Sequence, residues 1–260
     1  MEEREERSLR NLCARATASA KYPLVFRDRM AEETVRRNSL SVPSLSENEA
    51  VREGLYEAIA ADSIRTVLRH DPNALIIRIG CGFDTLFPII DNGHCRYLNL
   101  DHKEIIDLRN GLMACRIRED VLPCDYMSGQ WLEEMDHSRH VIAVFMDSLL
   151  YEKKEEVHRL IDLCARSFKA CEMLLEYRRA GIADLFSLSH NAKDDARGRW
   201  ILDRPEIDLS VISGAIVQTK RITHLPELYE KALRLEKRQL LSYQMRREAP
   251  GFAILMNHSD

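Results

Sequence analysis

The stretch ALIIRIGCGFDT, residues 74–85, decides the fold that this sequence predicts. An apolar run typical of a buried strand ends on two glycines, Gly80 and Gly82, with one residue between them. Such a pair lets the backbone turn tightly and lets a ligand approach where a Cβ would otherwise stand. A dinucleotide-binding turn has a third glycine, but Thr85 occupies that position here. The turn is therefore not expected to cradle a pyrophosphate, and a tight turn without any ligand remains an alternative.

Beyond this turn, short apolar runs alternate with amphipathic segments. The predicted strands cover residues 74–80, 95–101, 116–125, 140–147 and 171–177. The predicted helices cover residues 102–114, 130–136, 152–168 and 225–245, and a closing strand covers 251–258. Regular alternation implies a parallel sheet with helices on both faces, and a helix between two late β segments implies an antiparallel edge strand. The predicted fold is therefore α/β and Rossmann-like, with a mostly parallel sheet and extra N-terminal helices.

The domain organisation is predicted as one compact unit with an N-terminal helical cap. Residues 1–70 form the cap, with helices expected over 8–22, 28–38 and 47–72. Residues 71–260 form the α/β domain, and residues 178–208 are expected to be an insertion that covers the substrate.

The composition excludes several classes of function. The chain has 260 residues, a net charge of −4, and 45% hydrophobic and 31% charged residues. These values are typical of a globular protein and give no positive field for nucleic acid or a membrane surface. No apolar stretch approaches the roughly 20 residues of a membrane span, and the charged N-terminus lacks the apolar core of a signal peptide. Seven cysteines without a C-x-x-C pair favour buried free thiols, and no metal site is expected. A cytoplasmic protein is the expectation.

Acidic residues follow three of the predicted strands. Ligands of parallel sheets bind outside the carboxyl ends of the strands, so residues at these ends are candidates for a site. Asp101, nineteen residues after Gly82, could accept hydrogen bonds from a ribose diol, or could cap the following helix. Asp125 could accept from an adenine amine, or be a solvated loop acid. Asp147 could meet an ammonium group, or be a cap or surface charge. Together the three favour a nucleoside that carries an amine and no phosphate, as S-adenosylmethionine does.

Several longer motifs resemble one family, the class I methyltransferases of the leucine carboxyl methyltransferase type. The similarity is greatest to the branch of small-molecule O-methyltransferases associated with polyketide biosynthesis. It covers residues 10–207 and is most specific between Gly80 and Arg109. The motifs are ARATASAKYPLVFRDRMA (14–31), IRIGCGFDTLF (77–87), DNGHCRYLNLDHKEIIDLRN (91–110), CDYMSGQWLEEM (124–135), LLYEKKEEVHRLI (149–161) and GRWILDRPEI (198–207).

The resemblance implies an S-adenosylmethionine site, with S-adenosylhomocysteine as the product. The glycine turn would line the methionine part, Asp101 would hold the ribose, and residues 124–126 would flank the adenine. Arg65 is the fallback for Arg52 at the cofactor carboxylate. The implied cofactor-binding residues are Lys21, Arg52, Gly80, Cys81, Gly82, Asp84, Asp101, His102, Cys124, Asp125, Tyr126, Met146 and Asp147.

Three features depart from the family pattern, and one of them is LDHKEII (100–106), which replaces a Pro after the acid region. Leu86 replaces an Arg that follows the Asp-Thr pair, and either Met146 or Asp147 stands where a Glu would meet the cofactor ammonium. The chain is therefore similar to a divergent member of the family.

The resemblance implies methyl transfer to the oxygen of a small-molecule carboxylate or hydroxyl. No catalytic residue is assigned, although a hydroxyl acceptor would need a base. The candidate bases are His102, Tyr151, Tyr177 and His190. Three alternatives stay open: cofactor binding without transfer, methylation of a protein carboxylate, and a nicotinamide-dependent oxidoreductase, which Thr85 disfavours.

Overall fold

The structure is a computed structural model that describes residues 3–177, 209, 216–221, 231, 233–234, 238–239 and 251–258. The predicted substrate cover at 178–208 and the candidate base His190 lie outside the described residues. Most of the predicted helix 225–245 also lies outside them. No helix in the described part of the chain is long and apolar enough to cross a membrane.

Contacts within the chain group its residues into two compact units that alternate along the sequence. Unit 1 comprises residues 1–74, 81–124 and 225–241. Unit 2 comprises residues 75–80, 125–224 and 242–260. The chain thus passes from one unit to the other between Gly80 and Cys81, and again between Cys124 and Asp125. The expected boundary at residue 70 stays a prediction.

Unit 1 joins three N-terminal helices to a pair of strands. Its elements are α1 (Glu3–Lys21), α2 (Arg29–Arg37), α3 (Glu47–Leu68), α4 (Phe87–Ile90), β2 (Arg96–Asp101), α5 (Lys103–Leu112) and β3 (Glu119–Pro123). Helix α1 packs against both α2 and α3. The parallel strands β2 and β3 pair Leu100 with Leu122 and Asp101 with Pro123.

The starts of α2 and α3 follow from local sequence. Asp28 caps α2 by accepting a hydrogen bond from the Ala31 amide at 2.8 Å. Ser46 and Glu49 form a reciprocal capping box at the start of α3, which satisfies backbone N–H groups that have no partner inside the helix.

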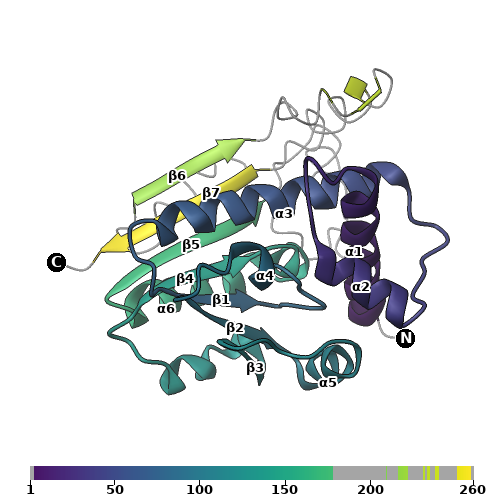
Figure 1. Ribbon diagram of the computed structural model, residues 1–260. Coiled ribbons are helices and arrows are strands. Elements are labelled where there is room, and N and C mark those ends of the chain that lie inside the picture. The colour runs from purple at the N-terminus through teal and green to yellow at the C-terminus, as the bar shows by residue number, and fades with distance from the viewer. Residues whose placement is uncertain are drawn as a thin grey trace, which may run out of the picture. The chain divides into compact units, whose positions relative to one another are not determined.

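The elements of unit 2 are β1 (Leu75–Ile79), η1 (Tyr126–Ser128), η2 (Gln130–Glu134), β4 (His140–Phe145), η3 (Ser148–Tyr151), α6 (Lys154–Ser167), β5 (Ala170–Tyr177), β6 (Ile216–Arg221) and β7 (Gly251–His258). In unit 2, strands β1, β4, β5, β7 and β6 lie side by side in that order (Figure 1). Strands β1, β4 and β5 are parallel neighbours; β7 is antiparallel to β5, and β6 is antiparallel to β7. Strands β1 and β4 are almost entirely buried, which explains their continuous apolar sequence.

The predicted strands and the observed ones agree closely for β1, β2, β4, β5 and β7. The helix expected over 130–136 is instead a short 3-10 helix, Gln130–Glu134. Gly129 precedes it with a left-handed φ of +75°, and the segment is too short to complete two α-helical turns.

Candidate functional site

The glycine turn after β1 is held by the backbone of β2. In unit 1, the Cys81 amide donates to the Leu100 carbonyl at 3.0 Å, and the Gly82 amide donates to Asp101 Oδ2 at 2.7 Å. Gly82 has a φ of +52°, in the left-handed region that favours glycine. The residue type at position 82 is therefore required by the turn itself.

Asp101 ends β2 and already accepts two backbone hydrogen bonds. Its second oxygen, Oδ1, accepts from the His102 amide at 2.8 Å, and its carbonyl accepts from the Cys124 amide at 2.8 Å. The side chain is only 5% exposed, and burial raises its pKa against the opposing effect of these amides. Each carboxylate oxygen has two lone pairs, so each oxygen has capacity for one more donor.

Helix α1 lies beside this carboxylate and the turn. A Cβ built on Gly82 would come within 2.8 Å of Ser8 Oγ. The positive charge of Arg4, one turn earlier in the helix, lowers the pKa of Asp101, although less than burial raises it. The first part of α1 is thus a neighbour of both Gly82 and Asp101, which the sequence did not reveal.

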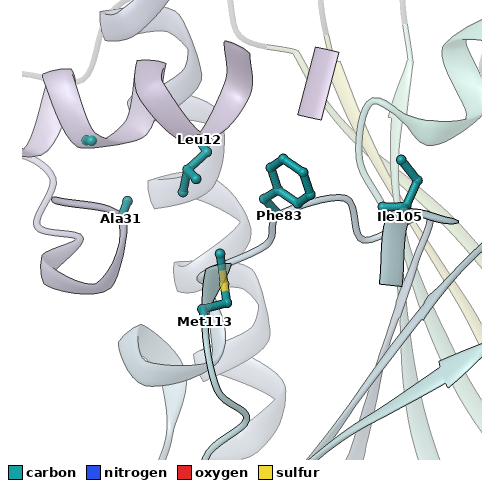
Figure 2. Packing of buried hydrophobic residues seen from close by; sticks show 6 residues of the cluster. Leu12, Ala31, Phe83, Ile105 and Met113 are labelled. Atoms are coloured by element: carbon teal, nitrogen blue, oxygen red, sulfur yellow. The ribbon is translucent and has the colours of Figure 1, made fainter. Parts of the chain in front are cut away.

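Phe83 anchors the turn in an apolar cluster. Figure 2 shows its ring between Leu12 of α1 and Ile105 of α5, with Met113 nearby. Ala31 of α2 belongs to the same cluster. The turn is therefore packed against three helices of unit 1 through one side chain.

Asp84 supports the turn from inside. Its Oδ2 atom accepts from the Leu86 amide at 3.1 Å and from the Tyr97 hydroxyl at 2.9 Å. Asp84 and Tyr97 are both buried.

Thr85, in the position of the missing third glycine, makes internal contacts. Its hydroxyl donates to Asp28 Oδ2 at 2.5 Å and accepts from Arg15 Nε at 3.3 Å. Leu86, where the resembling family has an Arg, is 1% exposed. Contacts within unit 1 thus account for Thr85 in place of a third glycine and for Leu86 in place of the family's Arg.

In unit 2, Gly80 is enclosed by two side chains. It has a φ of +63°, and a Cβ there would collide with the Ser148 side chain and lie 3.3 Å from the Tyr126 ring. Tyr126 is buried, and its carbonyl accepts from the Trp131 indole at 3.0 Å. Asp125 caps η1 by accepting from the Met127 amide at 3.1 Å, a role that the sequence did not predict for this carboxylate.

The segment after β4 is backbone-strained. Asp147 has a φ of +60°, unusual for a residue with a side chain, and the Ser148 amide donates across it to the Met146 carbonyl at 2.7 Å. Glu176 of β5, which the sequence did not single out, accepts from the Asp147 amide at 3.0 Å. Met146 is buried and Asp147 is half-buried, so Asp147 is the more accessible of the two side chains.

The basic candidates lie on α1 and α3. Lys21 ends α1 and pairs with Glu47 at 3.6 Å. Arg52 is half-buried on α3. The fallback, Arg65, donates to the Ile89 carbonyl at the end of α4 at 2.6 Å. Arg65 is therefore engaged in holding α4.

The candidate bases have different settings. His102 is the N-cap of α5, and Tyr177 is fully buried at the end of β5. Tyr151 ends η3. The described part of the chain contains no group of three or more His, Cys, Asp or Glu side chains able to hold a metal ion.

Solved structures with a similar fold include methyltransferases. One is magnesium protoporphyrin IX methyltransferase from Synechocystis PCC 6803 with bound SAH, at a TM-score of 0.52 and 12% identity, covering 88% of this chain and 95% of that one. Another, from Thermobifida fusca YX and provisionally assigned as a methyltransferase, has a TM-score of 0.58 and 11% identity, covering 95% and 94%. The chain has the Rossmann-like α/β fold of these methyltransferases. No family model and no curated protein matches it.

Within this methyltransferase fold, the sequence did not predict the residues that support the glycine turn from other parts of the chain. Arg15, Ser8 and Tyr97 all contact the turn or lie against it. One signal could have revealed Arg15. It shares the spacing of Leu12 and Ser19, which places it on the buried face of α1.

Proposed function

We propose that the chain is an S-adenosylmethionine-dependent methyltransferase that methylates an oxygen of a small-molecule carboxylate or hydroxyl. One observation carries the proposal: in a methyltransferase fold, the left-handed Gly82 donates its amide to Asp101 at the end of β2. This bond sets a buried carboxylate directly beside a turn that has no Cβ.

The residues around Asp101 fit a ribose. One lone pair on each carboxylate oxygen remains for a hydroxyl donor, which matches a vicinal diol. Thr85 stands in the position of the third glycine, and its hydroxyl bonds to Asp28 and Arg15. The turn therefore lacks the open glycine backbone that a pyrophosphate would need. The set therefore favours a nucleoside without phosphates over a dinucleotide.

The remaining contacts are proposed residue by residue. Gly80, Cys81 and Gly82 would line the methionine part, with Asp84 holding the turn. Asp125, Tyr126 and Cys124 would flank the adenine, and His102 would lie beside the ribose. Lys21 and Arg52 would meet the cofactor carboxylate. Asp147 would meet the ammonium, which would lose its charged partner if Met146 stood there instead.

When bound, S-adenosylmethionine supplies a methyl group on a sulfonium that is already a good leaving group. The protein therefore has mainly to orient the cofactor and the acceptor and to exclude water. A carboxylate acceptor needs no base, which agrees with the full burial of Tyr177. A family relationship to the leucine carboxyl and polyketide-type O-methyltransferases, and action in the cytoplasm, are part of the same proposal.

A second candidate function is cofactor binding without transfer. Leu86 and Met146 are apolar, so neither side chain can replace the charged group that the resembling family has at that position, and both are buried. An ammonium group that loses a charged partner costs about 1–3 kcal/mol.

Isothermal titration with S-adenosylmethionine, S-adenosylhomocysteine and NADH tests the cofactor. We expect saturable binding of the first two and none of NADH, and saturable NADH binding alone would refute the proposal. A methyl-release assay over carboxylate and hydroxyl acceptors, including protein carboxyl termini, then separates transfer from binding.

A further inference from the structure

Arg15 links α1 to the glycine turn from far away in the sequence. Its Nη2 atom donates to the Phe83 carbonyl at 2.7 Å, and its Nε atom donates to Thr85 Oγ1 at 3.3 Å. These contacts bridge 68 and 70 residues of chain. A buried guanidinium thus touches the turn at both its backbone and its side chain.

The same guanidinium is surrounded by carboxylates. They are Asp28 at 3.7 Å, Glu53 at 3.5 Å and Glu57 at 3.9 Å. Burial lowers the pKa of Arg15, but the surrounding carboxylates outweigh burial, and the pKa is raised overall. The group therefore stays charged, and it joins α1, α3 and the start of α2 to one point on the turn.

The contacts act next to Gly82. The Phe83 carbonyl follows Gly82 by one residue, and Thr85 lies three residues after it. Without Arg15, this buried carbonyl would lose a charged donor. The peptide after Phe83, whose Asp84 amide donates to the Cys81 carbonyl at 3.0 Å, would then lose one restraint on its orientation. A shift of this peptide moves its bond to the Cys81 carbonyl, and that carbonyl belongs to the same peptide group as the Gly82 amide that donates to Asp101.

We propose that Arg15 is a positioning residue for the cofactor, because it holds the left-handed glycine turn in register with Asp101. The expected effect of Arg15 on cofactor affinity rests on the proposed function, whereas its effect on the turn does not. Arg15 is not one of the proposed cofactor-binding residues, since it affects the cofactor only through the turn.

A matched control is available in the same unit. Arg109 is also fully buried and pairs with Glu119 at 2.7 Å, but its partner is on β3. The same Glu119 carboxylate accepts from the Arg116 amide at 3.0 Å. Replacing Arg109 thus removes a buried ion pair and leaves the contacts of Arg15 intact.

The experiment compares Arg15→Met, Arg15→Lys and Arg109→Met with the unmodified chain. Amide hydrogen exchange is followed by NMR without any ligand, and S-adenosylhomocysteine affinity is measured by titration. In Arg15→Met we expect the amides of Gly82, Asp84 and Leu86 to exchange at least tenfold faster and the affinity to fall at least tenfold. In Arg109→Met we expect faster exchange at Arg116, with turn exchange and affinity within threefold of the unmodified chain.

Arg15→Lys keeps the charge but cannot make both turn contacts, so we expect values between those of Arg15→Met and the unmodified chain. It also serves as the test variant if Arg15→Met does not fold. Equal turn exchange in the Arg15 and Arg109 variants would overturn the positioning role. Failure of the unmodified chain to bind S-adenosylhomocysteine would instead overturn the proposed function, while the exchange comparison still decides the effect on the turn.

Discussion

The Asp101 carboxylate accepts hydrogen bonds from two backbone amides, those of Gly82 and His102. This dual use explains why a carboxylate, rather than an amide, ends β2. An Asn side chain would offer one acceptor oxygen and would turn an NH₂ group toward the other amide, from Gly82 or His102. The residue proposed to bind ribose is thus also a structural element of the turn.

For Asp101→Asn we expect S-adenosylhomocysteine to bind at least tenfold more weakly. Hydrogen bonds to a charged group contribute about 1.5–3 kcal/mol each, and about 1.4 kcal/mol corresponds to tenfold. We also expect a lower free energy of unfolding, because one buried amide loses its acceptor. Titration calorimetry and urea unfolding measure the two effects. Asp107→Asn, an exposed carboxylate on α5 that pairs with Lys103, is the control and should change neither quantity appreciably.

The raised pKa of Asp101 predicts a pH dependence of binding. Burial is the largest cause, so the carboxylate takes up a proton at a higher pH than an ordinary aspartate. A protonated oxygen donates and no longer accepts from a hydroxyl, so affinity should fall as pH decreases through this raised pKa. Calorimetric titrations at decreasing pH should show the loss, and Asp101→Asn should abolish it. A flat profile in the unmodified chain would contradict the ribose role.

The same shift has the opposite sign for folding. Because the folded pKa lies above the unfolded value, Asp101 contributes stability below the unfolded pKa, and that contribution is lost as pH rises through the folded pKa. Through the titration of Asp101, decreasing pH should therefore weaken ligand binding and increase the free energy of unfolding.

In unit 1, contacts between residues close in sequence set where a helix starts, whereas contacts between residues far apart in sequence set where a helix packs. The start of α3 is set by Ser46 and Glu49, which lie within four consecutive residues. The position of α1 depends instead on Arg15, Ser8 and the apolar cluster around Phe83, which join parts of the chain far apart in sequence.

For Ser46→Ala we expect a loss of about 1 kcal/mol in the free energy of unfolding, as is usual when a helix loses its N-cap. The Ser46 hydroxyl accepts from the Glu49 amide, and the Glu49 carboxylate accepts from the Ser46 amide in return. Urea unfolding measures the change. Ser63→Ala, in the interior of the same helix, should be neutral or slightly stabilising, because its hydroxyl only bonds to the Ile59 carbonyl one turn back.

Across the whole chain, two units alternate along the sequence, and the residues expected at one cofactor are divided between them. Cys81, Gly82, Asp101 and Cys124 belong to unit 1. Gly80 and the segments 125–126 and 146–147 belong to unit 2. Each segment has a defined local structure in its own unit.

The thiols provide a test of burial over the whole chain. All seven cysteines are free: Cys115 is exposed, Cys124 is half-buried, and the other five are buried. Burial raises the pKa of Cys171 to about 12 and that of Cys164 well above its usual value. A thiol reagent at mildly alkaline pH should therefore modify Cys115 first, and Cys164 and Cys171 only after unfolding. Cys115→Ser should remove the fast phase, and rapid modification of the buried thiols would contradict the packing.

Much of the fold could be predicted from the sequence, because strands and caps are encoded in neighbouring residues. The apolar runs of β1, β4 and β5, the paired glycines and the cap residues Asp28 and Ser46 are local signals. The carboxylate at the end of β2 was identifiable for the same reason. The short 3-10 helix at 130–134 was not, since its apolar spacing also fits an α-helix.

The sequence by itself determined where the chain turns after β1 and which acidic residue follows β2, since both depend on residues a few positions apart. Only the tertiary structure decided why Thr85 replaces a third glycine and what supports the turn. Thr85 bonds to Asp28 and Arg15, across 57 and 70 residues. No local pattern encodes such contacts, because burial of a charge and its partners is settled only when distant segments pack together.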